Sequence, residues 1–186
     1  MKVVLFCGGL GTRLREHSGG LPKPMVNIGS RPILWHIMKY YAHFGHKEFI
    51  LCLGYKADVI NNFFLNYDQY LPGDITISNG SRLMHHDESD IADWSSTLAD
   101  TGLKSNIGQR LKAIEKYIGD DGVFLANYAD GLTDLPLPEM IEFFKESGKI
   151  ACFICAKPSQ SFHVVTLKDD NLIDKIQYVR DTDLLI

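Results

Sequence analysis

Three glycines, a threonine and an arginine follow the first apolar run of the chain, in the stretch CGGLGTR at residues 7–13. Glycine lets the backbone come close to a phosphate and turn its N–H groups towards the anion. Thr12 adds a hydroxyl donor, and Arg13 adds a planar cation that can bind two phosphate oxygens at once. Ten residues further on, Lys23 stands between two prolines that stiffen its segment. Together these residues predict a site that neutralises a triphosphate and leaves its α-phosphorus open to attack.

Two other phosphate-binding motifs do not match this stretch. A dinucleotide-binding fingerprint needs G-x-G-x-x-G, and Leu14 stands where the third glycine belongs. A P-loop needs G-x-x-x-x-G-K-[ST], which does not occur in the sequence. A glycine-rich turn alone is also compatible with a plain tight connection. The prediction of a phosphate site therefore depends on the combination of GGLGTR with the later KPM.

The elements that must position these residues are predicted from the apolar pattern. Short apolar runs bounded by turns predict buried strands, and apolar positions three and four apart predict helices. Strands are expected at 2–7, 48–55, 74–78, 123–127 and 150–156, helices at 32–44, 58–67, 107–118 and 136–148, and a closing hairpin at 162–179. Residues 79–106 are polar and acidic and are expected to be irregular. The alternation predicts an α/β protein with a Rossmann-like three-layer fold and a mainly parallel mixed sheet.

The composition argues against several classes of function. With a formal net charge of −4, the 186-residue chain lacks the strongly basic surface of a nucleic-acid-binding protein. No stretch approaches the roughly 18 consecutive apolar residues of a membrane-spanning helix, and the first apolar run is too short for a signal peptide. We therefore expect a cytoplasmic protein of one domain, with no nucleic-acid partner and no membrane partner.

All four cysteines lie in apolar runs and are expected to be small buried side chains: Cys7, Cys52, Cys152 and Cys155. Cys152 and Cys155 form a C-x-x-C, but in a strand positions i and i+3 point to opposite faces. This geometry disfavours a shared metal ion or a disulfide between them.

With its later stretches included, the chain resembles a known family. GGLGTRL followed by LPKPMVNIGSRPIL resembles the signature of sugar-1-phosphate nucleotidylyltransferases. Residues 32–60, DWSSTLADTG, GQRLK and YADG continue the resemblance and are most similar to the glucose-1-phosphate cytidylyltransferase branch. The resemblance covers residues 1–150 and weakens after them. It implies a nucleotide-diphospho-sugar transferase fold, a role in sugar-nucleotide biosynthesis, and conversion of CTP and α-D-glucose 1-phosphate to CDP-glucose and pyrophosphate with Mg²⁺.

The resemblance also implies a set of site residues. The nucleotide-binding positions that match the family are Gly8, Gly9, Leu10, Gly11, Thr12, Arg13, Lys23, Ser105 and Arg110. Among the matched residues, Arg13, Lys23 and Asp130 are expected to be catalytic, with Asp130 as the magnesium ligand. Taken without the family, Asp130 is also compatible with a plain turn residue before Gly131. Arg110 is likewise compatible with a surface charge on its helix.

The implied reaction requires little acid–base chemistry from the protein. A sugar phosphate is already a nucleophile, so no general base is required. Catalysis then consists of in-line positioning and neutralisation of the charge on the leaving pyrophosphate. Mg²⁺ takes one or two carboxylates together with substrate oxygens, and ligands of a parallel sheet gather at the carboxyl ends of its strands. An aspartate at a strand end suits this chemistry.

Several positions depart from the family pattern on the sugar side. Ala129 replaces a glycine in the Y-G-D-G turn, and His163 stands where the family has glycine. The E-K-P step is absent, although Arg180 could supply a cation nearby. The family continues beyond LLI into further helices with a second metal-binding aspartate. We therefore expect residues 1–186 to form a single nucleotidyltransferase domain that lacks the C-terminal part of the family fold.

Three interpretations follow from this pattern. The first is a nucleotidylyltransferase that uses CTP and a sugar 1-phosphate, or a divergent one that uses another phosphorylated acceptor. The second is a non-catalytic CTP-binding module. The third is a structural α/β domain that assembles with partners. We favour the first, in a homo-oligomer whose size the sequence does not fix.

Overall fold

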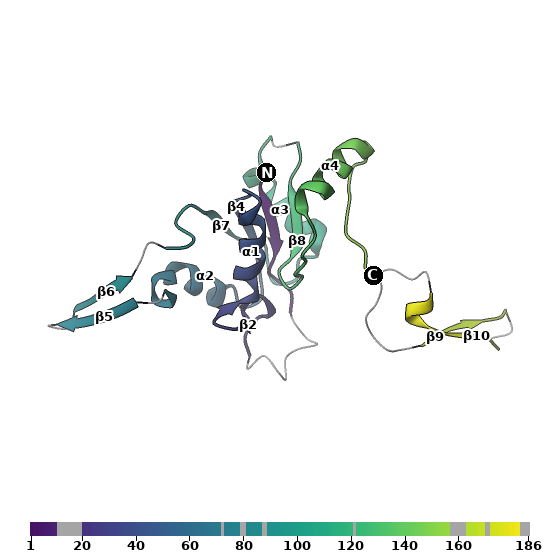
Figure 1. Ribbon diagram of the computed structural model, residues 1–186, viewed down its shortest axis with the longest axis horizontal. Helices are drawn as coiled ribbons and strands as arrows, with labels where there is room; N and C mark the ends of the chain where they lie inside the picture. The colour runs from purple at the N-terminus through teal and green to yellow at the C-terminus, as the bar shows by residue number, and fades with distance from the viewer. Residues whose placement is uncertain are drawn as a thin grey trace. The chain divides into compact units, whose positions relative to one another are not determined.

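The computed structural model describes residues 1–10, 20–71, 73–78, 81–86, 89–120, 122–156, 163–169 and 172–182 (Figure 1). The chain forms two compact units, Met1–Leu137 and Pro138–Ile186. Three residues of the glycine-rich stretch, Gly11, Thr12 and Arg13, lie outside the described residues. None of the described helices is long and apolar enough to cross a membrane.

The centre of the first unit is a four-stranded sheet with the order β7-β4-β1-β8. Its strands are β1 (Val3–Phe6), β4 (Glu48–Leu53), β7 (Ser95–Asp100) and β8 (Leu125–Tyr128). All pairings in it among the described residues are parallel. Phe6 lies in register with Cys52 of β4 and with Tyr128 of β8, so the carboxyl ends of these strands lie at one edge. The predicted α/β class with a parallel sheet is confirmed.

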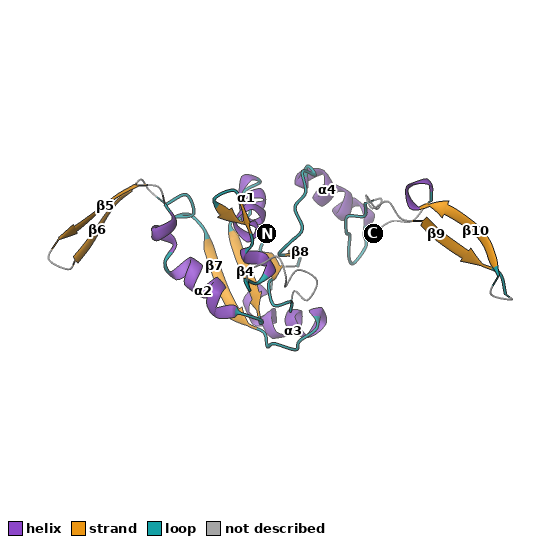
Figure 2. Cartoon of the chain, turned by 90° about the horizontal axis from the view of Figure 1, so that it is seen from below, coloured by secondary structure: helices purple, strands orange, loops and turns teal. Residues whose placement is uncertain are grey.

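Helices cover both faces of this sheet and complete three layers (Figure 2). On one face, α3 (Ile107–Ile118) packs against a core cluster that includes Val4. Successive side chains of a strand point to opposite faces, so the fully buried Val3 and Leu5 point to the other side of the sheet. That side is covered by α1 (Ile33–His43). Strands buried on both faces are near-continuous apolar runs, which is why the sequence made them visible.

Shorter elements connect the strands and helices of the first unit. α2 (Ala57–Leu65) and the 3₁₀ helix η3 (Tyr67–Tyr70) follow β4. The 3₁₀ helix η2 (Lys23–Met25) precedes a small antiparallel pair, β2 (Asn27–Ile28) with β3 (Arg31–Pro32). Two of the three residues of η2 are buried, which anchors the backbone that carries the lysine.

The start of α3 is fixed by a capping box. The Asn106 side chain accepts a hydrogen bond from the Gln109 backbone N–H at 2.9 Å, and the Gln109 side chain accepts one from the Asn106 N–H at 2.8 Å. Both exchanges satisfy N–H groups that have no partner inside the helix. Ile114 and Ile118 of the predicted apolar stripe are buried, and so is Arg110 on the same face. The interpretation of Arg110 as a surface charge is therefore wrong.

The region between β4 and α3 differs from the expectation. The strand expected at 74–78 is present as β5 (Gly73–Ser78), but it pairs antiparallel with β6 (Ser81–His86) in a separate hairpin. The central sheet is instead extended by β7, within a segment expected to be irregular. β7 lies at the edge of the sheet, and Ala99 is its one buried residue. With two apolar residues among its six, this edge strand has no apolar run to reveal it.

The second unit contains the predicted final helix and closing hairpin. α4 (Leu137–Ser147) is followed by β9 (His163–Leu167) and β10 (Ile173–Tyr178), which pair with each other in antiparallel fashion. The short 3₁₀ helix η4 (Val179–Asp181) comes after β10 and includes Arg180. His163, the first residue of β9, is exposed.

The strand predicted at 150–156 is wrong, because residues 151–156 have no regular secondary structure. A buried strand forms where a neighbouring strand pairs with its backbone, and among the described residues no strand pairs with this segment. Cys152 is half-buried and Cys155 exposed, so the expectation that both are buried is also wrong. Cys7 and Cys52 are buried as expected.

Candidate active site

The candidate site lies at the carboxyl edge of the central sheet. Gly8 comes shortly after β1, Gly54 directly after β4, Thr101 directly after β7, and Asp130 two residues after β8. Because the strands are parallel and in register, these positions share one edge, the edge at which open α/β sheets bind ligands. Gly8 is buried, whereas Gly9 and Leu10, the next residues of the glycine-rich stretch, are exposed.

A buried guanidinium ties three strand ends together. Arg110, which is 4% exposed, donates from Nη1 to the Leu53 carbonyl at 2.9 Å and to the Thr101 hydroxyl at 2.6 Å. Its Nη2 donates to the Gly8 carbonyl at 3.0 Å. α3 thus supplies one side chain that contacts the chain after β1, the end of β4 and the chain after β7.

Two glycines make room for this side chain. A Cβ atom on Gly8 would lie 2.2 Å from Nη1 of Arg110, and one on Gly54 would lie 2.9 Å from the same nitrogen. The Gly54 Cβ would also lie 3.0 Å from the Gly8 carbonyl oxygen. Any larger residue at either position would displace the guanidinium from the strand ends.

The described hydrogen-bond acceptors of the Arg110 guanidinium are all neutral groups. Among the described residues, no carboxylate forms an ion pair with it. Two buried thiols experience its charge: burial raises the pKa of Cys52 to about 11 and that of Cys7 further, and the nearby guanidinium opposes both shifts. A buried cation with neutral acceptors favours an anion at the same edge of the sheet.

The second cation of the site is paired with the predicted metal ligand. Lys23 Nζ lies 3.2 Å from Oδ2 of Asp130, and the two side chains are 23% and 43% exposed. The two residues are 107 positions apart, and the fold brings them together as η2 meets the turn after β8. Both groups are therefore partly open to solvent.

Two hydrogen bonds hold the backbone of the turn that carries Asp130. The Asn127 side chain donates to the Gly131 carbonyl at 3.2 Å, and the Gly131 N–H donates to the Tyr128 carbonyl at 3.4 Å. Ala129 is 2% exposed, so the methyl group that departs from the family pattern is packed into the interior. Asp130 itself is exposed at the tip of the turn.

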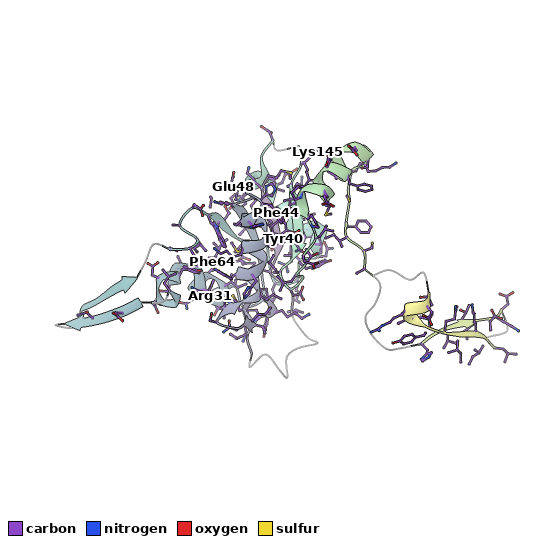
Figure 3. All side chains as sticks on the ribbon, in the orientation of Figure 1. Arg31, Tyr40, Phe44, Glu48, Phe64 and Lys145 are labelled. Carbon is purple, nitrogen blue, oxygen red and sulfur yellow. The ribbon has the colours of Figure 1, made fainter. Side chains whose placement is uncertain are left out.

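α1 anchors the chain beyond this turn. The Tyr40 hydroxyl donates to the Leu135 carbonyl at 2.8 Å, and the Tyr40 ring packs edge-on against Phe44 one turn further along the helix (Figure 3). Burial raises the pKa of Tyr40, and the charge of Asp134 adds to the shift. The loop after β8 is therefore fixed on both sides of Asp130.

The carboxylate of Asp130 fits one way of binding Mg²⁺. The described residues contain no group of three or more His, Cys, Asp or Glu side chains that could enclose a metal ion. Mg²⁺ at phosphate-transfer sites is held by one or two carboxylates together with phosphate oxygens and water, so one exposed aspartate at a strand end is a suitable donor.

Ser105 joins the Arg110 network indirectly. Its hydroxyl donates to the Thr101 carbonyl at 2.5 Å, in the connection between β7 and α3. Of the predicted site residues, the structure therefore gathers Gly8, Ser105 and Arg110 around Thr101, and Lys23 with Asp130 in a second group.

Three residues at this edge were missed by the sequence reasoning. Thr101 and Gly54 contact or border the Arg110 guanidinium. Lys56 is the N-cap residue of α2, in a left-handed conformation with φ of 52°, and its side chain donates to the Gly20 carbonyl. Gly54 and Thr101 are the first residues after strands, but Gly54 fell inside the strand predicted at 48–55, and Thr101 follows a strand that the apolar pattern does not show.

Fold and site together define a class of protein. A parallel sheet with a glycine-rich stretch after its first strand and a lysine–aspartate pair at the same edge is suited to binding nucleotide phosphates. Residues 2–177 match the family described as nucleotidyl transferase, so the chain belongs to that family. The predicted family membership is confirmed.

The curated relatives are more specific. The chain is 43% identical over 168 residues to a glucose-1-phosphate cytidylyltransferase of Salmonella typhimurium, covering 90% of this chain and 65% of that protein. It is 36% identical over 172 residues to a probable glucose-1-phosphate cytidylyltransferase of Bacillus subtilis, covering 91% of this chain and again 65% of the relative. The chain thus spans just under two thirds of the length of these relatives.

Solved structures confirm the fold. A UTP-bound UGPase from Acinetobacter baumannii aligns with a TM-score of 0.60 and 18% identity, covering 97% of this chain and 69% of that one. HddC from Yersinia pseudotuberculosis, complexed with GMP-PN, aligns with a TM-score of 0.57 and 24% identity, covering 94% and 68%. The chain has the fold of nucleotide-diphospho-sugar transferases.

Proposed function

We propose that this chain carries the nucleotidylyltransferase site of an enzyme that joins CTP and α-D-glucose 1-phosphate to give CDP-glucose and pyrophosphate. The observation that carries the proposal is the pair of Lys23 and Asp130, 3.2 Å apart, at the same sheet edge as the glycine-rich stretch. The choice of CTP and glucose 1-phosphate is supported by the identity to cytidylyltransferases over 90% of the chain.

The reaction proceeds by one displacement at phosphorus. A phosphate oxygen of glucose 1-phosphate forms a bond to the α-phosphorus of CTP. The bond from that phosphorus to the oxygen bridging to the β-phosphate breaks, and pyrophosphate leaves with the electron pair. No proton transfer is needed, so positioning and charge neutralisation supply the catalysis.

Each predicted residue has a part in this step. The backbone of Gly8, Gly9, Leu10 and Gly11, with Thr12 and Arg13, binds the triphosphate, and Ser105 and Arg110 support the nucleotide side. Lys23 neutralises charge that develops on the reacting phosphates, as preorganised cations do at transferring phosphoryl groups. Asp130 would hold Mg²⁺, which supplies further neutralisation of the β- and γ-phosphates when bound.

The proposal is tested by pyrophosphate release. The 186-residue chain is incubated with Mg²⁺, glucose 1-phosphate and each of CTP, UTP, GTP and dTTP in turn, with omission of the sugar phosphate as the control. Release that needs both CTP and glucose 1-phosphate supports the proposal. Release with another triphosphate overturns the choice of CTP. Calorimetric binding of CTP without any release identifies a CTP-binding module instead.

A further inference from the structure

We propose that Thr101 is a positioning residue for this reaction. Its hydroxyl fixes the orientation of the Arg110 guanidinium, which in turn orients the peptide between Gly8 and Gly9 in the glycine-rich stretch. The inference rests on the proposed function and adds to it a residue that does not itself touch the substrate. It is carried by the hydrogen bonds of four residues, Gly8, Leu53, Thr101 and Arg110, which we call the loop network.

Thr101 is placed with both hydrogen-bonding functions of its hydroxyl in use. The side chain is 5% exposed. Oγ1 donates to the Leu53 carbonyl at 2.6 Å and accepts from Nη1 of Arg110 at 2.6 Å. The Thr101 backbone N–H donates to the same carbonyl at 3.1 Å, which continues the β4–β7 ladder by one bond. The hydroxyl therefore has one orientation, and it presents a lone pair to the guanidinium.

The guanidinium passes this orientation to the glycine-rich stretch. Nη2 of Arg110 holds the Gly8 carbonyl at 3.0 Å, and the described residues contain no cis peptide bond. In a trans peptide the C=O and the following N–H point in opposite directions. With the Gly8 carbonyl turned towards Arg110, the Gly9 N–H must point away from it.

The residue that carries this N–H lies at the surface of the described site. Gly9 is exposed, and a Cβ atom built on it would have no heavy atom of the described residues within 4 Å, its two chain neighbours aside. Its N–H donates to none of the described residues. A fixed N–H in open space beside a glycine is a donor suited to a phosphate oxygen, so the loop network prepares the first phosphate contact before the nucleotide arrives.

Charge adds to this geometry. Arg110 has neutral acceptors alone among the described residues, so its positive charge stays available to an anion at the strand ends. Loss of the Thr101 hydroxyl would leave a buried N–H of a cation without its acceptor, and the guanidinium would move to find another. The Gly8 carbonyl would then lose the shorter of its two described hydrogen bonds and keep the one from the Tyr55 N–H at 3.4 Å.

The test compares Thr101→Val, which keeps the shape and removes the hydroxyl, with Thr101→Ser, which keeps the hydroxyl. Thr97→Val, on the strand that ends just before Thr101, is the matched control. We measure KM for CTP, KM for glucose 1-phosphate, kcat, and the dissociation constant of CTP by calorimetry.

Thr101→Val is expected to raise KM and Kd for CTP by about tenfold, the effect of one lost hydrogen bond to a charged group. KM for glucose 1-phosphate is expected to stay within about twofold, and Thr101→Ser is expected to restore CTP binding.

Each outcome decides the inference. CTP constants of Thr101→Val equal to those of the wild type overturn it, and so does an equal defect in Thr101→Ser. If Thr101→Val does not fold, Thr101→Ala takes its place, because it removes the hydroxyl without placing a methyl group against the guanidinium, and the same rise in the CTP constants is expected. A wild-type chain that binds CTP without turnover defeats the proposed function and leaves the Kd comparison decisive. A wild-type chain that binds no CTP overturns both.

Discussion

Two networks of polar side chains join distant segments of the first unit, and they differ in how charge is compensated. In the loop network, the Arg110 guanidinium is bound by two backbone carbonyls and one hydroxyl. In the second network, which we call the turn network, Trp35 donates to the Tyr67 hydroxyl and Tyr67 donates to Asp90, each at 2.7 Å. Lys39 completes it, with Nζ 3.5 Å from Oδ2 of Asp90.

The turn network has both signs of charge. The carboxylate of Asp90 has Lys39 beside it, and the Arg31 guanidinium lies over the ring of Tyr67 at 5.2 Å. Burial, followed by the hydrogen bond to Asp90, raises the pKa of Tyr67 well above its usual range, so the hydroxyl keeps its proton. The network ties α1 and η3 to the turn that leads into β7.

The difference separates a stabilising role from a ligand-binding role. The one carboxylate of the turn network, that of Asp90, is paired with Lys39 and accepts from the Tyr67 hydroxyl, so loss of the network is expected to lower stability. A network that leaves a cation with neutral acceptors at the strand ends is arranged for a ligand. Changes on the ligand side should therefore alter activity with little effect on folding, and changes in the turn network should do the reverse.

The largest effect is expected from Lys23→Ala. Removal of the cation at the reacting phosphates should lower kcat by at least about a thousandfold, as loss of a charge-neutralising side chain does in phosphoryl transfer. Because its described ion-pair partner is the partly exposed Asp130, the melting temperature should change little. Pyrophosphate release and calorimetric unfolding are measured together. Lys112→Ala, which also removes a lysine from an exposed pair, is the control; full activity in Lys23→Ala would remove the lysine from the site.

Asp130→Asn should come second. The amide keeps the size of the side chain but loses the charge that holds Mg²⁺, so turnover should fall by about a hundredfold at fixed Mg²⁺. The Mg²⁺ concentration for half-maximal rate should rise as well, which a titration of the rate against Mg²⁺ measures. Asp134→Asn, in the same exposed loop, is the matched control. If Asp134→Asn shows the larger defect, the metal ligand has been placed on the wrong aspartate.

Tyr67→Phe should affect stability instead of activity. It removes one hydroxyl that is both donor and acceptor in the turn network, which should lower the free energy of unfolding by about 1–3 kcal/mol. Urea unfolding gives the stability, and kcat/KM for CTP in native conditions should equal that of the wild type. Tyr117→Phe, at a tyrosine 40% exposed, serves as the comparison. A loss of activity without loss of stability would contradict the division between the two networks.

Much of the fold was predictable because burial on both faces leaves a continuous apolar run. β1 and β4 are such runs, and α3 shows its stripe at every turn. β8 is an edge strand with no fully buried residue, and it was found from the apolar run that leads into it. β7 could not be found, because an edge strand with one buried residue has no such run. The segment at 150–156 has the run and forms no strand, which shows that an apolar pattern does not specify a pairing partner.

The residue types of the site were predictable from the sequence, whereas most of the hydrogen bonds between them were not. Arg110 lies three residues after Ile107 and four before Ile114, so the helical period itself places it on the buried stripe. Its acceptors could not be read from the sequence, because they are backbone carbonyls supplied by strand ends. Thr101 was hidden for a related reason: its position after a strand is visible only once β7 is known.

The smallest effect is expected at the border of the turn network, from Asp93→Asn. The hydrogen bond from Lys47 lowers the pKa of Asp93 in the folded protein. A carboxyl with a lowered folded pKa stabilises the protein above its unfolded pKa of about 3.9 and loses that contribution as the pH falls through the folded value. Asp93→Asn should therefore be slightly less stable than the wild type near neutral pH, and the difference should vanish in acid.

Urea unfolding of both proteins at about pH 6 and about pH 3, in low and high salt, measures this difference. Both side chains of the pair are exposed, at 42% and 60%, so high salt should shrink the effect near neutral pH. Lys47→Met should remove the pH dependence of the difference, since it removes the donor. A difference that grows in acid would mean that Asp93 is stabilised in its protonated form, and the charge compensation assigned to this border would then be wrong.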